Sequence, residues 1–292
     1  MRRAASLAVV VIGGAVLALS PGLGLANARS RAHVCSGTPS NPGVLAGQYG
    51  SGVVVNGSCV VNNGPAHVVG PLTLKSGAVL IAAFGMKGSK LSVTGDVTVQ
   101  KGATMLLGCN TTSFACVDDP NQSAPTLTSP GSVTGNVTEK APLGVIIHSS
   151  TIGGSIKETG GGGGMNCSPT GPFAAFQSPV FSDYEDNTIT GGITISHVTS
   201  CWLGVIRNHI GKSLRLTSNS MADPDAIEIE KNVIARNLAC FNNKQHVWDS
   251  ADTGPGLYPR AIGRNTVHHY RLGQCLTAGP LTPDGVPAGG PF

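Results

Sequence analysis

The stretches NTITGGITI (187–195), NHIGKSLRL (208–216) and NVIARNLAC (232–240) decide the fold. Each begins with an asparagine, and apolar residues follow two, six and eight positions later. Side chains alternate between the two faces of an extended chain, so these apolar residues share one face. One short strand cannot bury such a row alone. The repeat therefore predicts a β-solenoid, in which each coil buries its row against the next.

The same apolar slots recur earlier in the chain, which predicts about seven coils in total. They are filled by Val68, Leu72, Leu74, Val93, Val97, Val99, Val133, Val137, Ile152 and Ile156. A second apolar strand is predicted in the coils at 78–81, 104–107, 143–147, 203–206 and 226–229. These short, β-branched segments favour β coils over helical repeats.

Asparagines occupy the turn before the strand in four places: Asn187, Asn208, Asn232 and Asn265. Asparagine tolerates left-handed backbone, and its amide can form hydrogen bonds with the neighbouring coil. We therefore expect a structural ladder of asparagines and not a ligand site.

The N-terminus is typical of a secretory signal peptide at residues 1–28, with Arg2 and Arg3 before an apolar run and a small-x-small motif ending at Ala28. The run is too short to span about 30 Å of hydrocarbon, so a membrane anchor is the weaker interpretation. We expect a secreted protein with no membrane span after cleavage. Residues 29–275 then form the β-helix domain, and the Pro/Gly-rich residues 276–292 form a disordered tail.

Charge and cysteine content narrow the class of protein. Cleavage removes two arginines and no acidic residue, so the formal net charge falls from +4 to +2, and no basic cluster indicates nucleic-acid binding. The 8 cysteines all follow the signal and fit an oxidising compartment. Of the many possible pairings we predict sequential neighbours: Cys35 with Cys59, Cys109 with Cys116, Cys167 with Cys201, and Cys240 with Cys275.

Gly-punctuated coils, short strands and the asparagine ladder resemble the right-handed parallel β-helix proteins of the pectin-lyase-like superfamily over residues 52–275. The chain also resembles uncharacterised exported β-helix proteins of high-GC Gram-positive bacteria. Bactofilins are similar in coil pattern, but they are cytosolic and cysteine-poor. We predict an all-β, right-handed parallel β-helix with capped ends, whose N-terminal cap begins near Gly52 to Val61, and with three loop insertions at 109–131, 160–186 and 241–264.

Loop insertions are where solenoids carry function. The second and third insertions are expected on one lateral wall, and Tyr184, Trp248 and Tyr258 are candidate platforms for sugar rings. The first hypothesis is therefore a non-catalytic protein that binds an extracellular polysaccharide or the cell-envelope surface. Self-assembly into a surface polymer is a further alternative.

The resemblance also implies a second hypothesis, a calcium-assisted polysaccharide lyase or a glycoside hydrolase. Asp183, Glu185 and Asp186 are candidate metal ligands, since Ca²⁺ prefers oxygen donors. The candidate catalytic acids and cations are Asp223, Asp225, Glu228, Glu230, Lys231, Arg207, Arg215 and Arg236. A solvated polar face explains the same residues, and we favour that interpretation because no lyase motif matches them.

Overall fold

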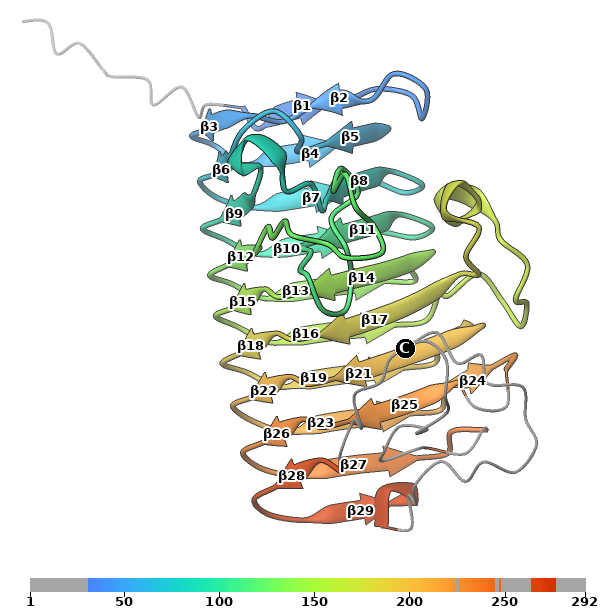
Figure 1. Ribbon diagram of the computed structural model, residues 1–292. Coiled ribbons are helices and arrows are strands. Elements are labelled where there is room, and N and C mark those ends of the chain that lie inside the picture. Colours follow the sequence, from blue (N-terminus) through green and yellow to red (C-terminus); the bar gives the residue numbers. More distant parts are fainter. Residues whose placement is uncertain (1–30, 224–225, 245–246, 248–263, 277–292) are drawn as a thin grey trace, which may run out of the picture. The chain divides into compact units, whose positions relative to one another are not determined.

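The computed structural model describes residues 31–223, 226–244, 247 and 264–276 (Figure 1). In these residues the fold is all-β, with three long parallel sheets of 10, 8 and 9 strands. Successive strands along the chain belong to different sheets, and each strand pairs with strands one coil away. The arrangement is consistent with a parallel β-solenoid, whereas its right-handed winding and its number of coils stay predictions.

We name the three long sheets I, II and III. Sheet I contains β1 (His33–Cys35), β4 (Val53–Val55), β7 (Leu72–Leu74), β10 (Val97–Val99), β13 (Val137–Lys140), β16 (Ile156–Thr159), β19 (Ile193–Ser196), β23 (Leu214–Thr217), β27 (Leu238–Phe241) and β29 (Arg271–Gly273). Sheet II contains β2 (Gly43–Val44), β5 (Ser58–Val60), β8 (Val79–Ala82), β11 (Thr104–Leu107), β14 (Gly144–His148), β17 (Phe181–Glu185), β21 (Trp202–Ile206) and β25 (Ile227–Glu230). Sheet III contains β3 (Gly47–Tyr49), β6 (Ala66–Val68), β9 (Leu91–Val93), β12 (Ser132–Val133), β15 (Thr151–Ile152), β18 (Thr188–Ile189), β22 (His209–Ile210), β26 (Val233–Ile234) and β28 (Thr266–Val267).

Smaller elements complete the described part. A two-stranded sheet pairs β20 (Thr199–Ser200) with β24 (Ser220–Met221). Three short 3₁₀ helices are η1 (Met86–Gly88), η2 (Gly171–Phe176) and η3 (Gln274–Leu276). Helix therefore contributes little, as the sequence predicts.

The inward slots predicted from the repeat are confirmed as the core. In sheet I, for example, Val97 pairs with Leu72 on one side and with Val137 on the other, and all three are buried. Every other predicted slot residue is buried as well. Each such aliphatic side chain stabilises the fold by about 1.5–3 kcal/mol relative to exposure, so the stacking of the coils provides the core.

The predicted second apolar strands all lie in sheet II, but the repeated Leu-Gly-Val-Ile segments are not in register. Ile146 of β14 pairs with Asp183 of β17, and Asp183 pairs with Gly204 of β21. Gly204 therefore stacks in line with Ile146 and not with Gly144. The two segments are displaced by two residues, which keeps the same side chains inward because the strand period is also two.

The asparagine ladder is confirmed. Nδ2 of Asn187 donates to Oδ1 of Asn208 at 3.0 Å, and Asn208 donates in the same way to Asn232 at 2.9 Å. Asn232 continues the ladder to Asn265 at 2.7 Å. These side chains are buried, and their amides bond to each other and to backbone groups, so the ladder is structural.

A second ladder was not predicted. Nδ2 of Asn219 donates to Oδ1 of Asn243 at 3.0 Å, and Asn243 donates to Oε1 of Gln274 at 3.1 Å. The three residues lack the spacing to a following apolar row that identifies the first ladder, so the repeat did not reveal them.

The four predicted disulfides are all present: Cys35–Cys59, Cys109–Cys116, Cys167–Cys201 and Cys240–Cys275. Cross-links of this kind stabilise a chain by roughly 2–4 kcal/mol each. They fit a protein that folds in an oxidising compartment.

Two boundaries predicted from the sequence are wrong. The stack begins at His33, in β1, and not near Gly52, because the first coil is made of strands of only two or three residues that carry no row of aliphatic side chains. The second insertion ends before Phe181, because 181–185 is strand β17 of sheet II. Ser182 and Tyr184 occupy the inward positions of β17, so its pattern lacks the aliphatic row that marks the other strands.

Several predictions lie outside the described residues. They are the signal peptide at 1–28, the tail beyond 276 and most of the third insertion at 241–264. Among the described residues, no helix is long and apolar enough to span a membrane. The two insertions that the structure describes are 109–131, called here the first loop, and 160–180, called the second loop.

Candidate functional site

The candidate site lies on the outward side of sheet II, where β14, β17 and β21 are neighbours (Figure 1). Side chains alternate along a strand, so Ser182 and Tyr184 of β17 point inward while Asp183 and Glu185 point outward. His148 is the last residue of β14, and the register pairs it with Glu185. The strand register thus brings one imidazole beside two carboxyl groups.

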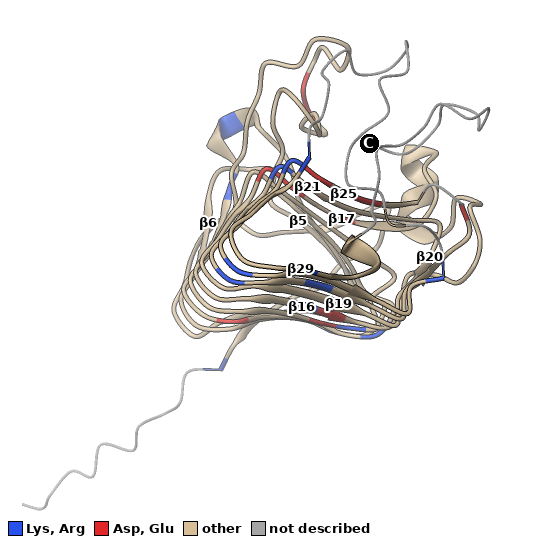
Figure 2. Cartoon of the chain, turned by 90° about the horizontal axis from the view of Figure 1, so that it is seen from below, with Lys and Arg blue, Asp and Glu red and all other residues tan. Residues whose placement is uncertain are grey.

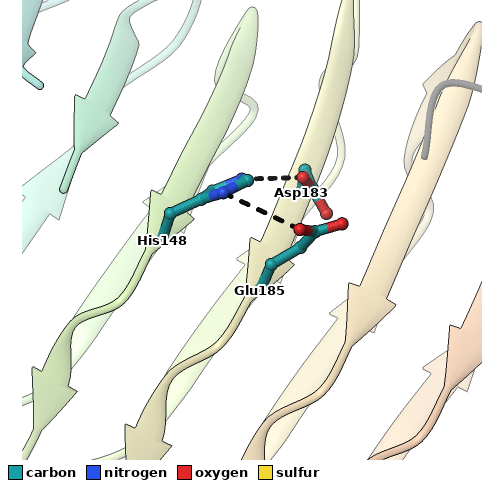
Figure 3. Close-up of side chains that lie close together, drawn as sticks. All are labelled: His148, Asp183 and Glu185. Carbon is teal, nitrogen blue, oxygen red and sulfur yellow. Dashed lines mark hydrogen bonds and ion pairs between the residues drawn. The ribbon is translucent and has the colours of Figure 1, made fainter. Parts of the chain in front are cut away.

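The three outward side chains form a compact cluster (Figure 3). Nε2 of His148 lies 2.7 Å from Oδ2 of Asp183, and Nδ1 lies 3.8 Å from Oε2 of Glu185. One donor atom from each residue lies within 4.8 Å of the other two, and the side chains are only 2%, 2% and 3% exposed. Oδ1 of Asp183 has no hydrogen-bond partner in the described part of the chain.

Arg207 closes one side of the cluster. Its Nη2 lies 2.5 Å from Oε2 of Glu185, while Nε and Nη2 contact the two carboxylate oxygens of Asp186 at 2.7 and 3.0 Å. The two contacts with Asp186 form a bidentate pair, the geometry that suits guanidinium and carboxylate. The side chains of Arg207 and Asp186 are 24% and 23% exposed, so this edge of the cluster reaches solvent.

The backbone at the corner of the coils explains why Asp186 and Arg207 meet. Each residue directly precedes a ladder asparagine and has a positive φ, of 56° in both cases. Lys231, before Asn232, has a φ of 49° and takes the same place in the next coil. Acidic and basic residues therefore lie next to each other near β21 and β25 (Figure 2).

The first loop folds back onto this cluster. Oγ of Ser113 donates to Oδ2 of Asp186 at 2.7 Å and lies 3.3 Å from Nδ1 of His148. Nδ2 of Asn110 donates to the same Asp186 oxygen at 3.1 Å. The ring of Phe114 lies 5.1 Å from the ring of His148, centroid to centroid. The loop thus supplies both polar contacts and an apolar cover.

Burial and charge shift the pKa values of the cluster in different directions. Burial raises the pKa of Asp183 well above its ordinary value and raises that of Glu185 to about 7, where the charge of Asp183 adds to the effect. Burial lowers the pKa of His148, although nearby carboxylates oppose it. Burial alone would raise the pKa of Asp186 too. The hydrogen bonds and charge of Arg207 outweigh burial and hold the pKa of Asp186 below its ordinary value. The site therefore combines two carboxyl groups that hold their protons to a higher pH than usual with one that stays ionised at neutral pH.

A small cavity adjoins the cluster. It encloses about 70 Å³ and is lined almost entirely by apolar atoms of Phe114 from the first loop, of the second loop around η2, and of sheet II. The lining residues are Thr104, Leu106, Phe114, Ile146, Pro172, Phe173, Phe176, Ser178 and Phe181. The two loops emerge from different coils of the stack, yet they cover the same face of sheet II.

The inward side of β17 carries a second cluster of titratable groups. Oη of Tyr184 lies 2.5 Å from Oε2 of Glu139 and 3.0 Å from Oε2 of Glu158, and Oγ of Ser182 donates to Glu158 at 2.8 Å. A phenol has one proton, so the second contact of Tyr184 requires a protonated carboxyl group. Accordingly, burial raises the pKa of Glu158 to about 7 and that of Glu139 well above its ordinary value, where the neighbouring Glu158 adds to the effect.

The predicted metal ligands are only partly brought together. Asp183 and Glu185 lie side by side, but they face His148, which the sequence did not suggest, and Asp186 turns toward Arg207. Tyr184 has 0% exposure and lies inside the coil. The expectation that Tyr184 offers an exposed platform to a sugar is therefore wrong, while Trp248 and Tyr258 lie outside the described residues.

The predicted catalytic acids and cations do not gather in one place. Glu228 and Glu230 lie on the outward side of β25 but are buried, with 4% and 0% exposure, and not part of a solvated face. Asp223 accepts a hydrogen bond from Nε1 of Trp202 at 3.1 Å, and Asp225 lies outside the described residues. The predicted cations are likewise dispersed over different strands and turns.

Arg215 is on β23 of sheet I, where its guanidinium lies 5.2 Å from the ring centroid of Phe241. Arg236 lies in the turn between β26 and β27, and Lys231 follows β25, with both residues exposed. Arg207 alone among the candidate cations contacts the cluster described here.

Sequence reasoning missed His148, Ser113 and Asn110 as site residues. His148 directly follows the apolar strand 143–147, so a correct strand alignment would have placed it beside 181–185. No comparable signal exists for Ser113 and Asn110, because the path of a long loop is not periodic.

Comparisons with protein-family models, with curated proteins and with solved structures found no match to this chain. The geometry of the site therefore carries the argument about function.

Proposed function

We propose that the protein is exported and binds an extracellular glycan across the outward side of sheet II, between the first and second loops. Four disulfides and the predicted signal peptide support export. The observation that carries the binding proposal is the convergence of two loops, from different coils, over one face of the stack. The resemblance to pectin-lyase-like proteins is part of this proposal.

The proposed binding zone, which is the outward side of sheet II between the first and second loops, has side chains that suit a sugar. A sugar ring presents an apolar C–H face and hydroxyl groups, so its sites combine an aromatic ring with planar hydrogen-bonding side chains. Phe176 is 41% exposed and lines the cavity, while Asp186 and Arg207 are partly exposed. Ser113, which binds Asp186, is followed by Phe114 of the cavity wall. The polar and the apolar parts of the proposed binding zone are thus adjacent.

The size of the cavity limits what can enter it. A volume of about 70 Å³ is smaller than the roughly 150 Å³ cavity that holds benzene. We therefore place the sugar ring across Phe176, with at most a small apolar substituent inside the cavity. Because Arg207 is already paired with Glu185 and Asp186, the zone favours a neutral glycan over a polyanion.

The test is calorimetric titration of the mature protein with purified envelope polysaccharides and their oligosaccharides. Phe176→Ala should weaken binding by roughly 2- to 10-fold, since an aromatic contact contributes roughly 0.5–1.5 kcal/mol. Tyr270→Ala is the matched control, because Tyr270 is 68% exposed but lies in the last described coil, near β29. Equal losses in both variants, or no loss with Phe176→Ala, would refute the proposed zone.

Glycan cleavage is the second candidate function, favoured by one observation. Glu185, with a pKa raised by burial to about 7, is next to Asp186, whose pKa is held low by Arg207. Carboxyl groups with separated pKa values are what acid–base catalysis needs. Release of reducing ends or of unsaturated products, lost in Glu185→Gln, would support cleavage, and binding without either product would exclude it.

A further inference from the structure

We infer that His148, Asp183 and Glu185 bind one divalent transition-metal ion of the zinc and manganese class. This inference is independent of glycan binding. It concerns the buried half of the outward cluster, whereas the glycan proposal concerns the exposed half at Phe176, Asp186 and Arg207.

The geometry is the first support. One donor atom from each of the three residues lies within 4.8 Å of the other two (Figure 3). Ligands of a tetrahedral zinc ion, at about 2.0–2.2 Å from the metal, lie about 3.4 Å from each other. Small rotations of the side chains therefore suffice to close the site. The ligands come from two paired strands, β14 and β17, which fix their positions better than a loop would.

An unpartnered oxygen is the second and independent support. Oδ1 of Asp183 is buried and accepts no hydrogen bond in the described part of the chain. Figure 3 shows this second oxygen of Asp183 on the side of the Glu185 carboxylate. A buried polar atom without a partner is unfavourable, and native structures rarely keep one without a reason. A cation between Asp183 and Glu185 would supply the missing partner.

The charges around the site point the same way. Among the described residues, the carboxyl groups of Asp183, Glu185 and Asp186 face a single guanidinium, that of Arg207. When all three are ionised, two negative charges remain uncompensated, which is the charge that one divalent ion neutralises. Buried charges are stable only when paired or bound to a metal.

Ser113 sets the imidazole in the orientation that a metal requires. Its hydroxyl proton goes to the Asp186 carboxylate at 2.7 Å, so its oxygen can accept from Nδ1–H of His148, 3.3 Å away. Nε2 then presents its lone pair to Asp183, where a metal ion would replace the proton that joins the two atoms. Metal-bound histidines typically donate their other N–H in this way, which fixes the tautomer.

The donor set decides the class of metal. Imidazole nitrogen suits zinc, iron and other transition metals, and carboxylates add manganese to the list. Calcium takes six to eight oxygen ligands, whereas this buried site offers one nitrogen and two carboxyl groups. The structure therefore favours a transition metal over the calcium ion predicted from the sequence.

The experiment is titration of the mature, untagged, chelator-treated protein with ZnCl₂, MnCl₂ and CaCl₂ in a calorimeter. We expect zinc or manganese to bind with one-to-one stoichiometry and calcium to bind at least tenfold more weakly. His148→Gln and Asp183→Asn should each weaken binding by more than tenfold. The matched control is His209→Gln, because His209 is exposed on β22 of sheet III and is not part of the cluster.

Ser113→Ala covers the case in which a ligand variant does not fold. Ser113 is on the first loop and orients His148 without being one of the proposed ligands, so its loss should weaken binding by roughly 10- to 100-fold, as the loss of other residues that orient a ligand does. The visible spectrum of the Co²⁺ adduct should also change in this variant. Three results would overturn the inference: no transition metal binds, binding is the same in Asp183→Asn and His209→Gln, or calcium binds as tightly as zinc.

Discussion

The inward and outward sides of β17 carry similar chemical groups in opposite surroundings. Inward, Tyr184 joins two glutamates from sheet I, and no cation is within hydrogen-bond distance of this group among the described residues. Outward, Asp183 and Glu185 meet a histidine, and Arg207 links Glu185 to solvent. One strand therefore holds a closed acidic cluster on one face and an open, mixed-charge cluster on the other.

This difference shows how context assigns roles to the same side chains. Inward carboxyl groups can avoid a buried charge only by keeping protons, and Tyr184 shares hydrogen bonds with them. Outward carboxyl groups can instead be ionised against a guanidinium or a metal. We therefore expect the inward cluster to affect stability and the outward cluster to affect binding.

The largest expected effect is on stability, from Tyr184→Ala. It removes a fully buried aromatic ring and leaves two buried carboxyl groups without their phenol, so we expect a loss of about 3–5 kcal/mol in the free energy of unfolding. Urea unfolding followed by circular dichroism measures this. Tyr184→Phe keeps the ring and should lose only about 1–3 kcal/mol. A Tyr184→Ala protein as stable as the wild type would contradict the assignment of this residue to the core.

The pH dependence of stability is the next effect in size. The pKa of Glu158 is about 7 in the folded chain and 4.5 ordinarily, so the folded state binds more protons between these values. Its contribution is fully present below pH 4.5 and is lost as the pH rises through about 7, with a total of roughly 3 kcal/mol. The double variant Glu139→Gln, Glu158→Gln should remove this part of the fall in the free energy of unfolding with rising pH.

The outward carboxyl groups provide the control for that measurement. The raised pKa values of Asp183 and Glu185 also make the free energy of unfolding fall as the pH rises. Some dependence of stability on pH should therefore remain in the double variant. If the slope between pH 5 and 7 is unchanged by the double variant, the inward cluster is not the source. Urea midpoints at several pH values decide this.

The smallest expected effect is that of Arg207→Met on stability. About a quarter of this side chain is exposed, and ion pairs that reach solvent typically contribute about 1 kcal/mol or less. The pKa of Asp186 should rise, because Arg207 is what holds it down. Carbon-detected NMR titration of Asp186 measures that shift.

Arg215→Met is the control for this third variant, since Arg215 is an exposed cation on sheet I. It should leave the pKa of Asp186 unchanged. A loss above about 3 kcal/mol in Arg207→Met would mean that the outward cluster is as closed as the inward one, and the comparison of the two faces would fail.

The candidate site could be predicted only in fragments. The sequence indicates that the acidic residues Asp183, Glu185 and Asp186 form a metal-binding group, but it places them in a loop. Their true place in a strand splits the group, since alternation turns Tyr184 inward and keeps Asp183 and Glu185 outward. The aromatic residue that looked like a binding platform is for the same reason part of the core.

The sequence by itself determined the stacked β architecture, the buried aliphatic slots and the first asparagine ladder. These features repeat along the chain, and a strand period of two residues makes each inward position readable from its neighbours. Only the tertiary structure decided that His148 lies against Asp183 and Glu185, that Arg207 reaches Asp186, and that the first loop returns to cover them. Those contacts depend on the register between strands about 35 residues apart and on the path of an aperiodic loop, neither of which local periodicity specifies.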